Sequence, residues 1–145
     1  MVEKIINFDM DGTLADLYGV ENWLQYLQNG DEYPYSVAKP LLNLSTFARY
    51  INKLQSKGYK VNIISWLCKN SNAEYDELVT IAKLEWLQKH LKSVTFDEIY
   101  ILPYGTPKNT ISCGYLFDDE EHNRNMWGEG AYDVHNILGV LKEMA

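Results

Sequence analysis

The chain has 145 residues and a formal net charge of −7, and these values already exclude several classes of protein. The length suits one compact domain with a single core, and the composition is not that of a disordered or fibrous chain. No stretch approaches the roughly 18 consecutive apolar residues of a membrane-spanning helix. The first residues, MVEKIINF, look like the start of a strand rather than a cleaved leader. We therefore expect one cytoplasmic domain over residues 1–145, with no membrane partner.

The acidic balance also limits the partners. There are 13 Lys and Arg against 20 Asp and Glu, with no basic run that could follow a phosphate backbone, so duplex nucleic acid is not an expected partner. The negative net charge does not exclude a small anionic substrate, because a bound divalent cation and one local lysine can make the electrostatic potential inside a cleft positive. Cys68 and Cys113 lack a metal-binding spacing and are expected to be reduced thiols.

Predicted strands and helices alternate along the chain. Buried strands are predicted at four short β-rich runs: Lys4–Phe8, Val61–Ser65, Glu98–Leu102 and Gly114–Phe117. Ala131 and Tyr132 are compatible with a fifth. Apolar residues at helical spacing predict three helices: one that ends at Gly58, one that begins with a Ser71/Glu74 capping box and runs to about His90, and one after Asp133 as N-cap. This order predicts a Rossmann-like α/β fold, with three α/β/α layers and a mainly parallel central sheet.

Residues 17–42 do not fit the plain alternation. This segment contains a predicted helix, VENWLQYLQ, followed by a turn-rich stretch with two prolines and a glycine. An insertion placed directly after the first strand and its acids would lie over the end of the sheet. We interpret it as a small helical lid or flap; an ordinary crossover helix with its loop is the alternative.

Two carboxylates follow the first strand at positions that point to the same side. Residues i and i+2 of a strand share a face, so Asp9 and Asp11 would repel each other unless a cation or a shared chemical task holds them there. Ligands of parallel sheets bind beyond the carboxyl ends of the strands. Other polar residues are expected at that same edge: Ser65, Lys108, Asp118 and Asp119.

These residues, taken together, resemble the haloacid dehalogenase (HAD) superfamily of phosphohydrolases. The four motifs of that superfamily occur in order: DMDGT at residues 9–13, Ser65 at a strand end, Lys108 in a loop, and the acid pair Asp118 and Asp119. The first motif is specific for the superfamily. Ser65 and Lys108 are weak evidence by themselves and support the resemblance only through their positions in the order of motifs. The resemblance covers most of the chain and implies a single HAD-like domain.

The resemblance implies unequal roles for the first two acids. Asp9 would be the nucleophile that attacks phosphorus and forms an aspartyl-phosphate, which divides one difficult hydrolysis into two displacements. Asp11 would protonate the leaving oxygen and then activate the attacking water, for which it needs a raised pKa. A halide leaves without a proton, so the second aspartate favours a phosphatase over a dehalogenase.

The remaining motif residues would bind the metal and the phosphoryl group. Mg²⁺ suits hard oxygen ligands. The resemblance implies that the Asp9 side chain, the backbone carbonyl of Asp11 and an acid of the last motif hold it. Either Asp118 or Asp119 could be that acid; we favour Asp118, with Asp119 acting through water. Lys108 would neutralise Asp9 and the phosphoryl group. Ser65 and backbone amides near Met10 would donate hydrogen bonds to it. Gly12 permits a sharp turn, and Thr13 hydrogen-bonds within that turn.

The expected substrate is a small phosphomonoester. The chain looks most like the small-cap or capless members of the superfamily near the 5′(3′)-deoxyribonucleotidases, so a nucleoside monophosphate is one expectation. Trp66 would then stack on the base, although SWLCKN departs from the usual sequence after that motif, and packing is the alternative role. The second hypothesis for the whole chain is a phosphate-binding or regulatory HAD-like protein with weak catalysis.

Overall fold

The computed structural model describes residues 2–145 and contains a five-stranded parallel sheet. The strand order is β5-β4-β1-β6-β7. The strands are β1 (Ile5–Phe8), β4 (Lys60–Trp66), β5 (Glu98–Leu102), β6 (Tyr115–Phe117) and β7 (Ala131–Tyr132). The four predicted strands are therefore confirmed within a residue or two, and so is the short fifth strand.

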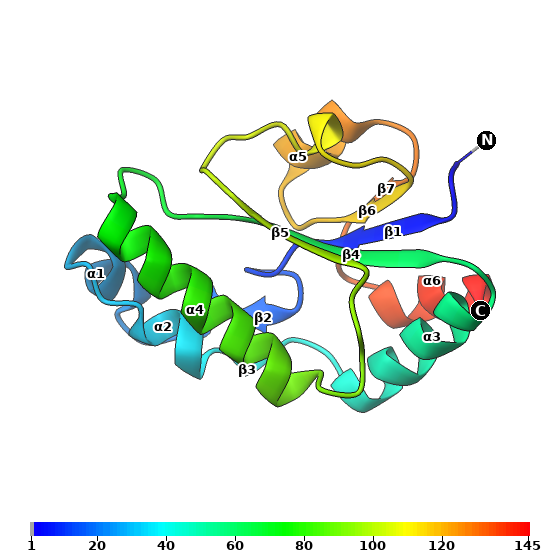
Figure 1. The fold of residues 1–145 in the computed structure, drawn as a ribbon, viewed down its shortest axis with the longest axis horizontal. Coiled ribbons are helices and arrows are strands. Elements are labelled where there is room, and N and C mark those ends of the chain that lie inside the picture. Colours follow the sequence, from blue (N-terminus) through cyan, green and yellow to red (C-terminus); the bar gives the residue numbers. More distant parts are fainter. Residues whose placement is uncertain (1) are drawn as a thin grey trace.

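Helices cover both faces of this sheet, as predicted for a Rossmann-like α/β/α fold. Figure 1 shows α3 (Leu44–Ser56) and α6 (Ile137–Met144) on one side and α5 (Glu121–Trp127) on the other. The long helix α4 (Ala73–His90) connects β4 to β5, and the 3₁₀ turn η2 (Lys108–Thr110) precedes β6. No helix within residues 2–145 combines the length and apolar character needed to cross a bilayer.

Two predicted helix starts were wrong, and one predicted end is confirmed. Helix α4 is capped by Asn72, whose side chain accepts a hydrogen bond from the Tyr75 amide, and not by a Ser71/Glu74 capping box. The last helix begins at Ile137 rather than after Asp133, because the Asp133 carboxylate accepts from the adjacent Val134 amide instead of capping a helical turn. Gly58 does follow the end of α3, with a φ of +93° that favours glycine.

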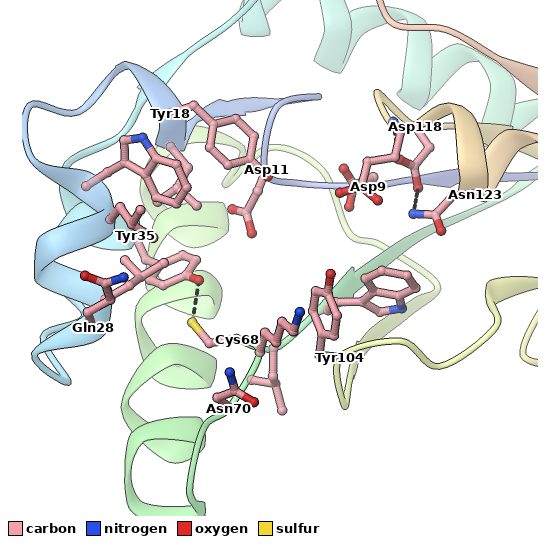
Figure 2. A pocket seen from close by; sticks show the side chains of 18 of the residues that line it. Asp9, Asp11, Tyr18, Gln28, Tyr35, Cys68, Asn70, Tyr104, Asp118 and Asn123 are labelled. Atoms are coloured by element: carbon pink, nitrogen blue, oxygen red, sulfur yellow. Dashed lines mark hydrogen bonds between the residues drawn. The ribbon is translucent and has the colours of Figure 1, made fainter.

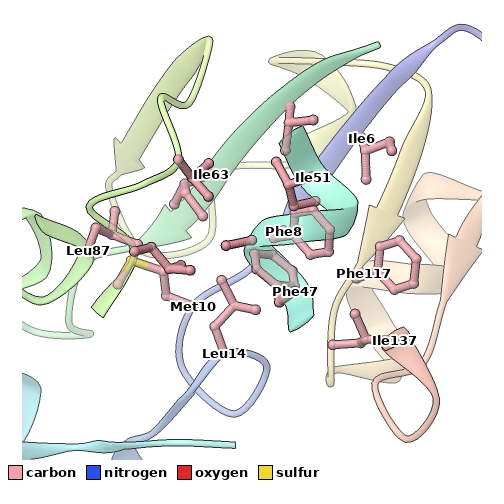
Figure 3. Close-up of a cluster of buried hydrophobic side chains, with 14 of the residues drawn as sticks. Ile6, Phe8, Met10, Leu14, Phe47, Ile51, Ile63, Leu87, Phe117 and Ile137 are labelled. Carbon is pink, nitrogen blue, oxygen red and sulfur yellow. The ribbon is translucent and has the colours of Figure 1, made fainter. Parts of the chain in front are cut away.

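The main core lies between the sheet and the face that carries α3 and α6. Phe8 at the end of β1 is fully buried and packs edge-on against Phe47 and in a stacked arrangement on Phe117, with ring centroids 4.9 and 5.1 Å away (Figure 3). Complete burial of a side chain of this size contributes about 1.5–3 kcal/mol. This packing holds the end of β1 in place immediately before Asp9.

The opposite face of the sheet carries a chain of amide hydrogen bonds. The Asn7 amide donates to the carbonyls of Cys113 and Tyr115 and accepts from the Asn62 amide, at 2.9, 3.0 and 3.0 Å respectively. The carbonyl oxygen of the Asn62 side chain in turn accepts from the Glu98 backbone amide at 3.1 Å. We name this set the amide chain. It connects β5, β4, β1 and β6 in one register.

The segment predicted as an insertion has its own small secondary structure. It contains the 3₁₀ turn η1 (Leu17–Gly19) and the helices α1 (Trp23–Gln28) and α2 (Tyr33–Val37). Near its C-terminal end, β3 (Lys39–Pro40) pairs antiparallel with β2 (Ala15–Asp16), which directly precedes the segment. The crossover between β1 and β4 is made by α3, which lies outside this segment. A second apolar cluster joins the segment to α4 through these buried side chains: Leu17, Tyr35, Tyr75, Val79 and Ala82.

Candidate active site

The sequence-predicted acids meet at the point where the strand order reverses. From β1 the chain proceeds to β4 on one side, whereas β6 and β7 lie on the other side, so the crevice between β1 and β6 is the usual ligand position in such sheets. Asp9 directly follows β1, and Asp118 directly follows β6. A cavity of about 570 Å³ opens at this edge, and both carboxylates line it.

Lys108 joins the first and the last acid motif. Its ammonium group lies 3.0 Å from Asp9 Oδ1 and 2.7 Å from Asp118 Oδ2, and all three side chains are buried. Burial alone would lower the pKa of Lys108, but the negative charges of Asp9 and Asp118 outweigh it and the pKa is raised. Lys108 is therefore a fixed positive charge beside both carboxylates.

Asp118 is held by further donors. Its Oδ2 atom accepts from the Asn123 side chain at 3.1 Å, its Oδ1 atom accepts from the Glu120 amide at 2.9 Å, and its backbone carbonyl accepts from Arg124. Burial and the neighbouring Asp9 nevertheless raise the pKa of Asp118 to about 6, against the opposing effect of Lys108. The site therefore holds this carboxylate in a fixed orientation, while its burial and the neighbouring Asp9 disfavour its negative charge.

Asp119 completes a group of three carboxylates with Asp9 and Asp118. One ligand atom from each lies within 4.8 Å of the others. Thr13 Oγ1 donates to Asp9 Oδ2 at 3.0 Å and approaches Asp119 Oδ1 at 3.5 Å. Burial first, and then the charge of Asp9, raise the pKa of Asp119 to about 8. These three oxygens repel one another in the absence of a cation.

The donor set fits a hard divalent cation such as Mg²⁺. All three groups are carboxylates, which Mg²⁺ prefers, and sulfur and imidazole ligands are absent from the group. Asp11 adds a fourth carboxyl group nearby, and when all four acids are ionised, the two ammonium groups in contact with them, Lys83 and Lys108, leave two negative charges uncompensated. A dication would offset that charge. The residues that would hold it are Asp9, Asp118 and Asp119, with the Asp11 carbonyl remaining a prediction.

Asp11 points to a different partner. Its Oδ2 atom accepts from Lys83, on α4, at 3.0 Å, and the same ammonium donates to Ser65 Oγ and to the Trp66 carbonyl, both at 2.7 Å. Burial raises the pKa of Asp11, Asp9 raises it further, and Lys83 opposes both. The two acids of the first motif are therefore separated: Lys108 holds Asp9, and Lys83 holds Asp11.

The far part of the cavity is largely aromatic and apolar. Figure 2 shows Asp9 and Asp118 at one end, Tyr35 and Gln28 at the other, and Asp11 between them. The insertion supplies one wall, with Leu17, Tyr18, Trp23, Leu24, Leu27, Gln28 and Tyr35. The last residue of β4 and the segment that follows it, residues 66–70, supply much of the opposite wall. A phosphate bound at the acids could therefore extend an organic group between these walls.

The other sequence-predicted residues lie in or beside this site in different ways. Trp66 lines the cavity, but its Nε1 donates to the Thr106 carbonyl at 2.8 Å, and its ring packs against Tyr104. The Met10 side chain is buried in the core, and no hydrogen bond within residues 2–145 uses the amides of Met10 or Asp11, so both are free to donate. Ser65 is fully buried and does not line the cavity, so its phosphoryl contact stays a prediction.

Two site residues were not predicted from the sequence. Lys83 lies among the buried residues Val79, Ala82 and Trp86 of α4, but apolar residues occur all around this helix, so its sequence gives no signal for the buried lysine. Asn123 lies five residues beyond Asp118, in the first turns of α5, and no motif identified it. Both contact the predicted acids directly.

Gly12→Ala is expected to disturb the three carboxylates. Gly12 has a φ of +79°, and a Cβ atom there would lie 2.3 Å from Asp119 Oδ2. The left-handed backbone alone costs roughly 1–2 kcal/mol for other residues. We expect a loss of stability of at least that size, measured by denaturant unfolding, together with a loss of the stabilisation by Mg²⁺ that is expected for wild type.

Gly30→Ala is the matched control for this substitution. Gly30 has a similar φ of +72°, but nothing lies within 4 Å of its added Cβ. It should show the backbone cost and keep the response to Mg²⁺. Equal responses to Mg²⁺ in both variants would contradict the inferred contact between residue 12 and the acid cluster.

Comparison with known proteins supports the fold. No protein-family model and no curated protein matches the chain. The D,D-heptose 1,7-bisphosphate phosphatase from Burkholderia thailandensis is similar in structure, with a TM-score of 0.58, 10% sequence identity and 98% of each chain covered. A hydrolase from Streptococcus pneumoniae TIGR4 has a TM-score of 0.58, 14% identity and 99% of each chain covered. The chain therefore has the α/β fold of these two proteins over nearly its full length.

Proposed function

We propose that the protein is a magnesium-dependent phosphomonoester hydrolase of the HAD type that works through an aspartyl-phosphate on Asp9. The observation that carries the proposal is the convergence of Asp9, Lys108 and Asp118 from three separate segments at the strand-order reversal, beside a cavity. The shared fold with a heptose bisphosphate phosphatase supports the same class of reaction. The DMDGT motif at residues 9–13 agrees with it.

The proposed reaction has two displacements at phosphorus. In the first, a carboxylate oxygen of Asp9 bonds to phosphorus, the bond from phosphorus to the alcohol oxygen breaks, and that oxygen takes a proton from Asp11. In the second, water gives its proton to Asp11 while its oxygen bonds to phosphorus, and the bond to Asp9 breaks. The products are the free alcohol and inorganic phosphate, and both aspartates return to their starting forms.

The other residues would bind and orient the phosphoryl group. Thr13 and Lys108 hold the two oxygens of Asp9, so the nucleophile has a fixed direction. Lys108 and the free amides of Met10 and Asp11 would stabilise the charge on the phosphoryl oxygens. Mg²⁺, when bound by the three carboxylates, would supply electrostatic neutralisation of the nucleophile and the phosphoryl group.

The cavity walls favour a substrate with a flat, uncharged organic part. A nucleoside monophosphate is the narrower proposal: its phosphate would lie at the acids, and its base would lie among aromatic side chains such as Tyr18, Trp23 and Tyr104. In this proposal residues 17–42 act as the small cap that closes over the base, because α2 anchors the segment on α4 while α1 has no buried residue.

The test is phosphate release from a panel of phosphomonoesters. The panel contains deoxy- and ribonucleoside monophosphates, sugar phosphates and p-nitrophenyl phosphate, each measured with Mg²⁺ and with a chelator. We expect release that requires Mg²⁺ and is fastest with a nucleoside monophosphate. A preference for sugar phosphates would reject the nucleotide and keep the reaction. Ligand binding without any release would instead favour the phosphate-binding, regulatory hypothesis.

A further inference from the structure

Lys83 is the most completely bonded charged group in the site. Its side chain is 1% exposed, and its ammonium nitrogen donates to Asp11 Oδ2, Ser65 Oγ and the Trp66 carbonyl at 3.0, 2.7 and 2.7 Å. A lysine ammonium has three N–H donors and no acceptor, so each donor has a partner. The nitrogen also lies 5.2 Å from the centroid of the Tyr35 ring. Its position is therefore fixed on several sides.

Two of these three partners belong to the central sheet. Ser65 and Trp66 are the last two residues of β4, and Ser65 is fully buried. The third partner, Asp11, belongs to the loop after β1 and lines the cavity. Lys83 therefore links the end of β4 to the carboxylate of Asp11, which lines the cavity, and fixes the position of that carboxylate.

The contact also determines which oxygen of Asp11 can carry a proton. An ammonium group only donates, so Oδ2 accepts from Lys83, and this contact favours Oδ1 as the oxygen that carries the proton of the neutral acid. No hydrogen bond within residues 2–145 involves that Oδ1 atom. The free oxygen of a cavity-lining carboxylate is the one able to meet a leaving group.

We propose that Lys83 is a positioning residue that holds Asp11 for proton transfer to the leaving group, an inference that rests on the proposed phosphomonoesterase function. Asp11 Oδ1 gives its proton to the alcohol oxygen as the bond from phosphorus to that oxygen breaks, and the oxygen keeps the electron pair of the bond. The carboxylate formed on Asp11 is paired with the Lys83 ammonium. Ser65 supports this arrangement through Lys83.

The dependence on the leaving group distinguishes this role from a general structural one. p-Nitrophenolate leaves without a proton, whereas the alkoxide of an alkyl phosphate requires one. Lys83→Met should therefore lower kcat/KM for an alkyl phosphate by about 100-fold, near the lower end of general acid effects, and by less than about 10-fold for p-nitrophenyl phosphate. Ser65→Ala should also lower kcat/KM more for the alkyl phosphate than for p-nitrophenyl phosphate, but by a smaller factor. An equal loss on both substrates would instead mean that Ser65 contacts the phosphoryl group directly.

Two further variants keep the test decisive. Lys89→Met removes an exposed lysine from the same helix and should leave both rates unchanged. Lys83→Met leaves the Asp11 carboxylate buried without a positive partner. It is therefore compared with the double variant Asp11→Asn/Lys83→Met, in which residue 11 carries no negative charge. Because Lys83 acts through Asp11, the double variant should have the same ratio of rates on the two substrates as Asp11→Asn alone.

Three results would overturn the inference. The first is an equal fall in kcat/KM on both substrates in folded Lys83→Met, and the second is no fall on either substrate. The third is a double variant whose ratio of rates on the two substrates is not the ratio found for Asp11→Asn alone. Failure of the proposed function is separate from these results, because it is observed with wild type alone: no phosphate would be released from any phosphomonoester with Mg²⁺.

Discussion

Asp9→Asn is expected to abolish phosphate release, with a fall in kcat of about 10⁴-fold or more, as for other nucleophiles removed from covalent mechanisms. Asp9 is buried, lines the cavity, and has both of its oxygens fixed by Thr13 and Lys108. An amide keeps the shape and the hydrogen bond from Thr13 but is a poor nucleophile toward phosphorus. The measurement is phosphate release with Mg²⁺, together with acid-quench trapping of phosphate on the protein.

The control is a second change from aspartate to asparagine outside the cluster. Asp16 accepts a hydrogen bond from the Gly19 amide at 3.0 Å, which an asparagine side chain can also do. Asp16→Asn should therefore keep full activity. Trapped phosphate should appear in wild type and in Asp16→Asn and be absent from Asp9→Asn. Substantial turnover by Asp9→Asn would reject the covalent mechanism without contradicting the fold or the proposed metal site.

Lys108→Met is expected to have the second largest effect, on both activity and stability. The ammonium group of Lys108 makes buried contacts with Asp9 and Asp118, and its loss leaves those carboxylates with a larger uncompensated charge. Removal of one partner from a buried ion pair typically costs about 3–5 kcal/mol. We expect a loss of that size in the free energy of unfolding, measured by denaturant titration with a chelator, and a loss of activity of about 10³-fold.

Mg²⁺ provides an internal check on this prediction. A dication at the three carboxylates supplies the positive charge that Lys108→Met removes, so saturating Mg²⁺ should stabilise the variant more than wild type. Lys69→Met removes an exposed lysine at the rim of the same cavity and should change the free energy of unfolding by less than about 0.5 kcal/mol. A similar loss in both lysine variants would contradict the buried contacts of Lys108 with Asp9 and Asp118.

The geometry of the acid cluster could be anticipated because it depends on topology. Short β-rich runs separated by helices predict parallel strands, and the carboxyl ends of parallel strands lie at one edge. Asp9 and Asp118 follow two such runs directly, so their proximity followed from the order of elements without any knowledge of side-chain packing. Lys108 was expected there because its loop leads into the strand that ends before Asp118.

Lys83 could not be anticipated because the sequence of α4 does not identify its buried face. Apolar side chains occur all around this helix: Leu78, Ile81 and Leu84 are exposed, whereas Val79 and Trp86 are buried. A lysine in such a pattern is normally assigned to solvent. Only the three-dimensional position of Asp11 supplies the counter-charge that makes its burial stable.

The start of α4 and the role of Trp66 illustrate two other limits. Ser71 and Asn72 are adjacent and both suit an N-cap, so the choice depended on which side chain faces the first helical amides; Asn72 does. Trp66 was expected in the cavity, and it lines it, but its bond to the Thr106 carbonyl depends on how a distant loop folds back. Such contacts between distant segments leave no periodic signal in the sequence.

The amide chain has a consequence for how the acid cluster tolerates change. A slip of one residue in any strand would turn its side chains to the opposite face, and here the register is specified by directional bonds through Asn7 and Asn62 rather than by shape alone. Hydrogen bonds on the face opposite the main core thus determine the relative positions of the strand ends. Apolar residues in that core can be exchanged for others of similar volume while Asp9 and Asp118 keep their separation, whereas loss of one amide leaves its buried partners unpaired.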